Sequence, residues 1–300
     1  MQVNASEPKK PVLLKLNIPF CVHAHGFGEQ PLIRGLDTRR LHFYAMALQR
    51  EIEANAREFS DCVVRAIHLG GGQASALKGE DLFALVQTVL EHYDVDDGAP
   101  VTIQASLLDI NGGKMPFFRR AGITRYDFEV ASLECRDFPN LDYPDTTMWL
   151  PEVSYMIHAY ENRNMGFVIL YGKNSITETN FRRSLLAFTR SNASHLTLRR
   201  YVGKDASDDE TCARQLEQAR TLLSENGCLE YLPLYFAPRG HEDAYARYEA
   251  GGMDIISFGM GARTRFDGVE TENTMDIETY FLYSADYRRI TAHVEPISTG

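Results

Sequence analysis

The chain has 300 residues, of which 44% are hydrophobic, and its formal net charge at pH 7 is -10. This apolar content is enough to bury the core of one large α/β domain or two smaller ones, and the acidic balance argues against nucleic acid as a partner. No apolar run approaches the roughly 18 residues that a membrane span requires, so no membrane association is expected.

Short β-branched runs alternate with longer amphipathic segments, a pattern typical of repeated βα units around a mostly parallel sheet. At least six such units are predicted, in one domain that spans 1–300, with a core at about 12–270 and tails at 1–11 and 285–300. Strands are expected at 12–18, 64–69, 100–105, 125–131, 166–171 and 195–199, and two further strands at 229–235 and 253–258.

Helices are expected between these strands. Segment 38–58 has apolar residues at every third or fourth position, which predicts one buried helix face. Segment 207–226 has Ser207 as its expected cap and Gly227 as its expected stop. Segment 133–152 is polar, contains three prolines and has no periodicity. It is therefore predicted to be a long loop over one end of the sheet.

The cysteines are widely separated in the chain and form no Cys-x-x-Cys pair and no disulfide framework. They are Cys21, Cys62, Cys135, Cys212 and Cys228. This usage fits a reducing compartment, and the N-terminal sequence MQVNASEPKK lacks the apolar segment of a secretory signal. A soluble, cytoplasmic protein is therefore expected.

Several motifs follow the predicted strands in order. IPFC (18–21) ends the first strand, HLGGGQAS (68–75) ends the second, and AGITRYDFEVAS (121–132) contains the fourth. Three glycines after a strand let backbone N–H groups approach a ligand, and a tight turn explains them equally well. With LYGKNSITET (170–179) and FGMGARTRFDG (258–268), this succession resembles the oxygen-independent coproporphyrinogen III oxidase branch of the radical SAM enzymes.

The resemblance implies an α/β fold, a partial TIM barrel of about six parallel βα units with extra C-terminal strands. Its site would lie at the C-terminal ends of the strands. The family holds a 4Fe-4S cluster through three thiolates spaced C-x3-C-x2-C, and these positions correspond to Cys21, His25 and Gly28. Because glycine has no ligating side chain, no 4Fe-4S cluster is expected here.

Other positions at which the family contacts S-adenosylmethionine also differ in this chain. They are occupied by Lys15, Asn17, Gln104, Ala131 and Val168. Only the glycine turn, Gly70, Gly71 and Gly72, is kept. Reductive cleavage of S-adenosylmethionine is therefore not expected, although the molecule could still bind. The contacts expected for it are Gly70, Gly71, Gly72, Gln104, Asn17, Tyr171 and Arg199.

Side chains alternate along a strand, so one face of each strand should point into the barrel. The residues expected there are Lys15, Asn17, Thr102, Gln104, Asp127, Glu129 and Ala131, together with His68 and Arg199. Glu129 stands where the family has glycine. It is interpreted as a general base or a ligand-anchoring carboxylate, with Lys15 or Arg199 as its electrostatic partner and Asp127 beside it. The alternative is an internal salt bridge that fills the space left by a lost cofactor.

The first loop offers a second kind of chemistry. Cys21, His23 and His25 form a C-x-H-x-H sequence, whose sulfur and imidazole groups suit zinc or iron. Three ligands within five residues are cramped, so a loop with solvent-facing histidines is an alternative. Heme ligation by His23 or His25 is another.

Three functions follow from these patterns. The first is an enzyme that carries out polar chemistry on a small molecule in the barrel lumen, a transferase or lyase with S-adenosylmethionine as electrophile or substrate. The second is a non-catalytic heme or porphyrin carrier, or an inactive partner of a true radical SAM enzyme. The third is a mononuclear metal enzyme that uses Cys21, His23 and His25. A homodimer and a complex with a radical SAM homologue are both left open as assemblies.

Overall fold

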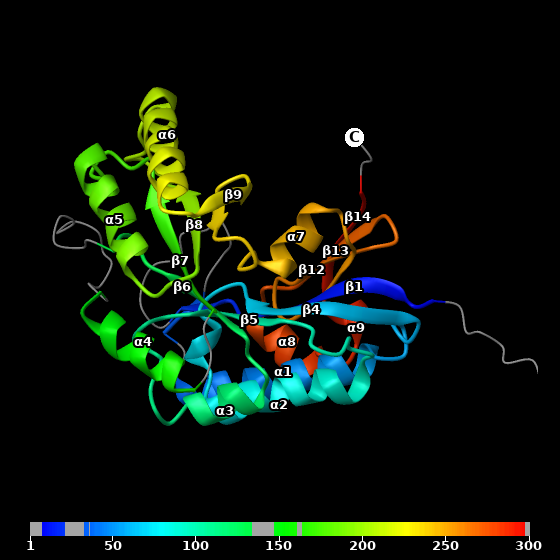
Figure 1. Cartoon of the computed structure of the whole chain (residues 1–300). Helices are drawn as coiled ribbons and strands as arrows, with labels where there is room; N and C mark the ends of the chain where they lie inside the picture. The colour runs from blue at the N-terminus through cyan, green and yellow to red at the C-terminus, as the bar shows by residue number, and fades with distance from the viewer. Residues whose placement is uncertain (1–7, 22–32, 36, 134–146, 161–163, 298–300) are drawn as a thin grey trace, which may run out of the picture.

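A computed structural model describes residues 8–21, 33–35, 37–133, 147–160 and 164–297. A curved sheet of twelve strands dominates this described part of the chain (Figure 1). The strand order across the sheet is β14-β13-β12-β11-β1-β4-β5-β6-β7-β8-β10-β9. The remaining two short strands, β2 (Phe20–Cys21) and β3 (Ile33–Arg34), pair only with each other.

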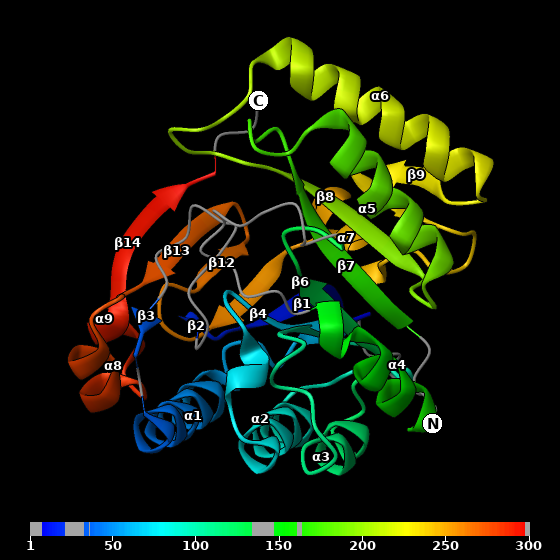
Figure 2. The ribbon, with the colours of Figure 1, turned by 90° about the vertical axis from the view of Figure 1, so that its left-hand side faces the viewer.

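The centre of the sheet consists of six βα units. The strands are β1 (Lys10–Asn17), β4 (Cys62–Gly70), β5 (Val101–Ala105), β6 (Arg125–Glu129), β7 (Asn164–Tyr171) and β8 (His195–Arg200), and neighbours pair in parallel. The helices that follow them are α1 (Thr38–Asn55), α2 (Gly79–His92), α3 (Met115–Arg120), α4 (Leu150–Ala159), α5 (Glu178–Arg190) and α6 (Asp209–Glu225). They cover the outer face of the curved sheet, while α7 (Ala244–Ala250) lies on the inner side (Figure 2). Because the sheet remains open, this is the predicted partial barrel.

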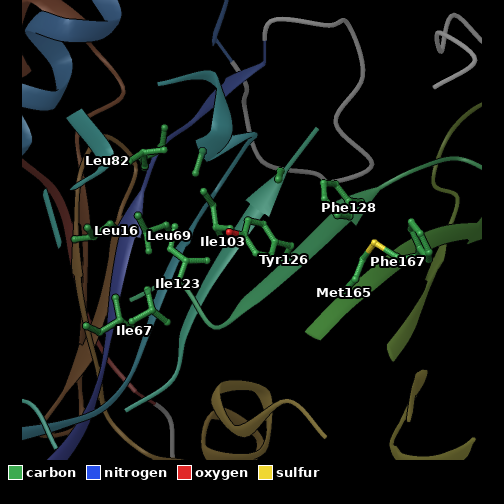
Figure 3. Close-up of a cluster of buried hydrophobic side chains, with 14 of the residues drawn as sticks. Leu16, Ile67, Leu69, Leu82, Ile103, Ile123, Tyr126, Phe128, Met165 and Phe167 are labelled. Carbon is green, nitrogen blue, oxygen red and sulfur yellow. The ribbon is translucent and has the colours of Figure 1, made fainter. Parts of the chain in front are cut away.

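The outer face of the sheet is apolar because alternate strand residues pack against the helices. In β6, with the sequence RYDFE, Tyr126 and Phe128 join the main apolar cluster. They lie beside Ile103 of β5 and Phe167 of β7 (Figure 3). Full burial of one such side chain contributes about 1.5–3 kcal/mol. The polar residues of β6 are left on the inner face, so this packing fixes what the lumen contains.

Both predicted helices with strong sequence signals are present. The Asp37 side chain caps α1 by accepting a hydrogen bond from the Arg40 N–H at 2.8 Å. The cap of α6 is Asp208, which accepts from the Thr211 N–H at 2.7 Å, so the prediction of Ser207 was wrong by one residue. Gly227 adopts φ 80° just after α6, as the stop signal predicted.

The C-terminal part departs from the predictions at two points. Segment 229–235 forms two antiparallel strands, β9 (Leu229–Leu232) and β10 (Tyr235–Ala237), because Leu234 takes a left-handed conformation with φ 70° and reverses the chain. Segment 285–300 was predicted as a tail but contains α9 (Tyr287–Ile290) and β14 (Thr291–Pro296). Since β14 is a largely exposed edge strand, its sequence carries no apolar alternation.

The other C-terminal elements continue the sheet beside β1. They are β11 (Ile255–Phe258), β12 (Arg263–Phe266), β13 (Val269–Asn273) and α8 (Ile277–Tyr283). The predicted 133–152 loop is also too long, because α4 already begins at Leu150, and residues 134–146 lie outside the described part. Within the described residues, no helix has the length and hydrophobicity needed to cross a bilayer.

Candidate functional site

The candidate site lies on the inner face of the sheet, where polar side chains from several strands meet. The alternation in β6 places Arg125, Asp127 and Glu129 on this face, opposite Tyr126 and Phe128. The neighbouring registers align Gln104 of β5 with Asp127, and Asp127 with Gly166 of β7. The strands therefore present their polar residues at corresponding heights in the lumen.

Arg125 and two carboxylates form the centre of this group. The Arg125 Nε atom lies 3.1 Å from Asp127 Oδ1 and 3.8 Å from Asp243 Oδ2, and all three side chains are largely buried. Burial raises the pKa of Asp127 to about 6, although the Arg125 charge acts in the opposite direction. A carboxyl group of this kind can gain and lose a proton near neutral pH.

His195 of β8 extends the group through Tyr231 of β9. The two side chains are 2.6 Å apart at His195 Nε2 and the Tyr231 hydroxyl. That hydroxyl accepts a hydrogen bond from the Asp243 N–H at 3.0 Å, and we assign its own proton to the contact with Nε2. Burial and the Arg125 charge lower the pKa of His195, so the ring is neutral and the network assigns its proton to Nδ1.

Gly166 leaves the space in which these groups converge. A Cβ at this position would overlap Asp127 Oδ1 and would lie 3.2 Å from Arg125 Nη2 and 3.3 Å from His195 Nδ1. Arg125 Nη2 and His195 Nδ1 are buried donors that have no hydrogen-bond partner among the described residues. Orphaned buried donors are costly, so this arrangement suits a ligand atom that accepts hydrogen bonds.

Glu129 is paired with Arg199, one of the two partners considered from the sequence. Arg199 Nη1 donates to Glu129 Oε1 at 2.7 Å, and the carboxylate is buried while the guanidinium is about one third exposed. The pair lies near the C-terminal ends of β6 and β8, which is the expected height of a barrel site. Lys15 lies lower in the lumen, and burial lowers its pKa.

The glycine turn packs tightly against this chain's own residues. The Gly71 N–H donates to Gln104 Oε1 at 2.9 Å, and the Asn17 amide donates to the Met260 carbonyl oxygen. A Cβ on Gly71 would overlap Asn17 Oδ1, and one on Gly72 would lie 2.7 Å from the Phe20 carbonyl oxygen. Close packing within the chain is thus a sufficient reason for these glycines.

Replacing Gly71 with alanine is expected to destabilise the fold by about 2–4 kcal/mol, because φ is +91° and the added methyl group meets Asn17. The matched control is Gly98→Ala, where φ is +76° but no atom lies within 4 Å of the added Cβ. That control should cost only about 1 kcal/mol. Urea unfolding of both variants measures the difference. Equal losses would show that packing against Asn17 contributes nothing.

Tyr171, expected to contact a ligand, lies elsewhere. Burial raises its pKa, and its electrostatic neighbours are Cys212, Arg200 and Arg220 on the helix side of β7 and β8. The prediction for this strand end was therefore off by one residue, because Leu170, and not Tyr171, is the residue of β7 that aligns with Arg199. Tyr171 does not join the lumen group.

The proposed metal loop is only partly described. Cys21 ends β2 and is buried, whereas His23 and His25 lie outside the described residues. Among the described residues, no three His, Cys, Asp or Glu side chains gather in a metal-binding arrangement.

Sequence reasoning missed Arg125 and Asp243. Arg125 could have been found, because it is two residues before Asp127 in a strand and therefore shares its face. Asp243 comes from the start of α7, where its side chain caps the helix by accepting from the Ala246 N–H. No pattern in the sequence indicates that this cap also faces Arg125.

Comparisons with known proteins support the family resemblance, although no protein-family model matches the chain. The heme chaperone HemW of Mycobacterium tuberculosis is 24% identical over 246 residues, which cover 76% of this chain and 62% of that protein. The oxygen-independent coproporphyrinogen III oxidase of Salmonella typhimurium is 24% identical over 316 residues, which cover 94% of this chain and 67% of that protein. The chain thus spans roughly two thirds of the length of these relatives.

The fold has a close counterpart among solved structures. Coproporphyrinogen III oxidase (HemN) from Escherichia coli, described as a radical SAM enzyme, superimposes with a TM-score of 0.83 and 17% sequence identity. The match covers 98% of this chain and 74% of that one. The predicted resemblance and the partial-barrel fold are therefore confirmed.

Proposed function

We propose that the chain is a small-molecule enzyme that uses a HemN-like barrel for proton-transfer chemistry without a three-thiolate iron–sulfur cluster. The observation that carries this proposal is the convergence over Gly166 of the Asp127 carboxyl group and two orphaned donors, Arg125 Nη2 and His195 Nδ1. An acid–base group beside fixed hydrogen-bond donors is the minimum equipment for polar catalysis.

Each of these residues has a separate role in the proposal. The donors of Arg125 and His195 hold an electron-rich atom of the substrate, and the Asp127 carboxylate removes a proton from the neighbouring atom. Asp127 is preferred over Glu129 as the base because burial brings its pKa to about 6, whereas Glu129 is engaged by Arg199. The Glu129–Arg199 pair then orients the substrate near the C-terminal ends of β6 and β8.

The donor set in the first loop does not fit the cluster of the relatives. At the three ligand positions stand Cys21, His25 and Gly28, and the one described member, Cys21, is only 2% exposed. One thiolate and one imidazole are a poor substitute for three thiolates. S-adenosylmethionine is still the first ligand to consider, because its sulfonium group can act as an electrophile in a polar displacement without an electron donor.

Anaerobically purified protein is therefore expected to hold far fewer than the roughly four irons per chain of a complete cluster, and to act on its ligand in air. The experiment combines iron and sulfide analysis with a thermal-shift screen of S-adenosylmethionine, S-adenosylhomocysteine and heme. Aerobic turnover of the ligands that bind is then measured. The His25→Cys/Gly28→Cys variant restores the thiolate spacing and serves as the positive control for cluster reconstitution.

Two results would contradict the proposal. A complete cluster in the unaltered protein, with a spectrum that bleaches under dithionite, would indicate radical chemistry instead. Stabilisation by heme alone, with a Soret band and no turnover, would favour a carrier. The second candidate is supported by the similarity to a heme chaperone.

A further inference from the structure

A second group of polar side chains, centred on Lys15, lies deeper in the lumen than Asp127. Helix α7 packs on the inner face of β1 and β4 and carries Tyr245. The Tyr245 ring joins Leu13, Ala66 and Ile255 in a small apolar cluster that is separate from the main core. Leu13 and Ala66 lie midway along β1 and β4, and Figure 1 shows α7 on the opposite side of these strands from α1 and α2. The cluster forms a floor beneath the Lys15 group.

Polar groups without partners stand directly above this floor. Lys15 of β1 aligns with His68 of β4 on one side and with Ser257 of β11 on the other. The His68 and Tyr245 rings are 5.0 Å apart. His68 Nδ1, the Tyr245 hydroxyl and Ser257 Oγ are buried and have no hydrogen-bond partner among the described residues. One buried polar atom without a hydrogen-bond partner is common in proteins, whereas three on the elements around one lysine indicate a binding site.

The charge around the Lys15 group is positive. No ion pair of Lys15 occurs within the described part of the chain, and the nearest acidic influence is Glu249 of α7. Glu249 is itself 3.2 Å from Arg265, so its charge is partly offset. Arg125, which the strand registers place level with Lys15, is already opposed by its own two carboxylates. The Lys15 ammonium is therefore the charge that lacks a counterpart.

His68 contributes no charge of its own. Burial and the charges of Lys15 and Arg125 lower its pKa to about 3, so the ring is neutral at physiological pH. A hydrogen bond with the Gln104 side chain acts in the opposite direction, and we assign the ring as its donor. The ring nitrogen left over, Nδ1, is then an acceptor. The donors available in this group are the Lys15 ammonium and the hydroxyl groups of Tyr245 and Ser257.

We infer that the floor of the lumen holds a carboxylate group of the substrate, bound by Lys15 and by the hydroxyl groups of Tyr245 and Ser257. This inference rests on the proposed function and names the substrate class, a small carboxylic acid. The carboxylate would sit at the floor, and the reacting part would lie above it, at Gly166. One ammonium and two hydroxyl donors suit the two oxygens and single charge of a carboxylate.

The test uses acetate as the probe and acetamide as its neutral counterpart, at constant ionic strength, with binding followed by thermal shift and calorimetry. Acetate is expected to bind the unaltered protein, and acetamide to bind at least about tenfold more weakly. Lys15→Met should weaken acetate binding by at least about tenfold. Lys204→Met, at an exposed lysine between β8 and α6, should leave it unchanged.

Tyr245→Phe gives a second readout that does not depend on the lysine variant. It removes an orphaned buried hydroxyl and keeps the ring in the floor cluster, so the midpoint of thermal unfolding without ligand should rise. Acetate binding should fall by about three- to tenfold in the same variant. A purely structural tyrosine would change neither binding nor its selectivity for acetate over acetamide.

Three outcomes would overturn the inference: no acetate binding, binding that persists in Lys15→Met, or stabilisation by inorganic phosphate in place of acetate. Because acetate binding is measured without turnover, its result is separate from that of the proposed function. If acetate does not bind but turnover is observed, the inference is wrong and the proposed enzymatic function is retained. If acetate binds but no turnover is observed, the proposed function is wrong and the carboxylate site is retained.

Discussion

Replacing Glu51 with alanine is expected to lower the free energy of unfolding by about 3–5 kcal/mol at pH 7. Glu51 lies on α1 and is only 1% exposed. Its carboxylate accepts hydrogen bonds from the Gly259 N–H at 2.8 Å, the Asn273 amide at 2.6 Å and the Tyr280 hydroxyl at 2.5 Å. The alanine variant leaves the Gly259 N–H and the Tyr280 hydroxyl without an acceptor, whereas the Asn273 amide keeps only its bond to the Gly259 carbonyl oxygen. Urea unfolding followed by circular dichroism measures the loss.

The same network connects the C-terminal strands to the site. Gly259 follows β11, Asn273 ends β13, and Tyr280 lies on α8, so Glu51 anchors three separate segments to α1. Tyr44, stacked on Tyr280, donates to the Asn17 carbonyl oxygen at the end of β1. Loss of Glu51 should therefore also loosen the end of β1 that carries Asn17 into the lumen.

Glu51→Gln is the matched control and should cost only about 1–2 kcal/mol, because one amide oxygen still accepts. The two proteins should also differ in pH dependence. Burial raises the pKa of Glu51 to about 7, so between pH 4.5 and 7 the folded state binds more protons than the unfolded state. Stability should then fall as the pH rises through this window, by on the order of 3 kcal/mol relative to the glutamine variant. Parallel pH profiles of the two proteins would contradict the raised pKa.

The inner face of the central strands could be predicted because β6 alternates so regularly. In RYDFE the aromatic residues pack outward and the charged residues point inward, and a period of two leaves no other arrangement once one face is buried. The same rule placed Lys15, Gln104 and Glu129 on the lumen side. It failed at Tyr171, where a strand that is apolar on both faces gives no sign of which residue points inward.

The rest of the site depends on contacts that no local pattern records. Tyr245 lies on α7 and Asp243 caps this helix, more than one hundred residues after β6. Both reach the lumen because α7 lies on the inner side of the sheet. The hairpin of β9 and β10 turns at Leu234, a residue type that rarely adopts a positive φ. These features depend on contacts between segments that are far apart in the sequence, so no local sequence pattern predicts them.

Asp127→Asn is expected to reduce aerobic turnover of the substrate by about 10²–10⁴-fold, the usual contribution of a positioned acid–base group. Asparagine keeps the shape of the side chain and a contact to Arg125 but cannot accept a proton. Asp97→Asn, at an exposed aspartate in the turn before β5, is the matched control and should retain full activity. Steady-state rates of the two variants, measured on the ligand that the thermal-shift screen identifies, test the assignment.

The pH profile distinguishes a base from a residue that only shapes the site. Since burial raises the pKa of Asp127 to about 6, the ionised form becomes dominant as the pH rises through that value. Turnover by the unaltered enzyme should therefore rise across the same range, and the residual activity of Asp127→Asn should not follow it. If Asp127→Asn keeps its turnover rate within about threefold of the unaltered enzyme, and its rate still rises near pH 6, Glu129 would be the better candidate for the base. Glu129→Gln would then be the variant that loses turnover, because Glu129 is the other lumen carboxylate on β6.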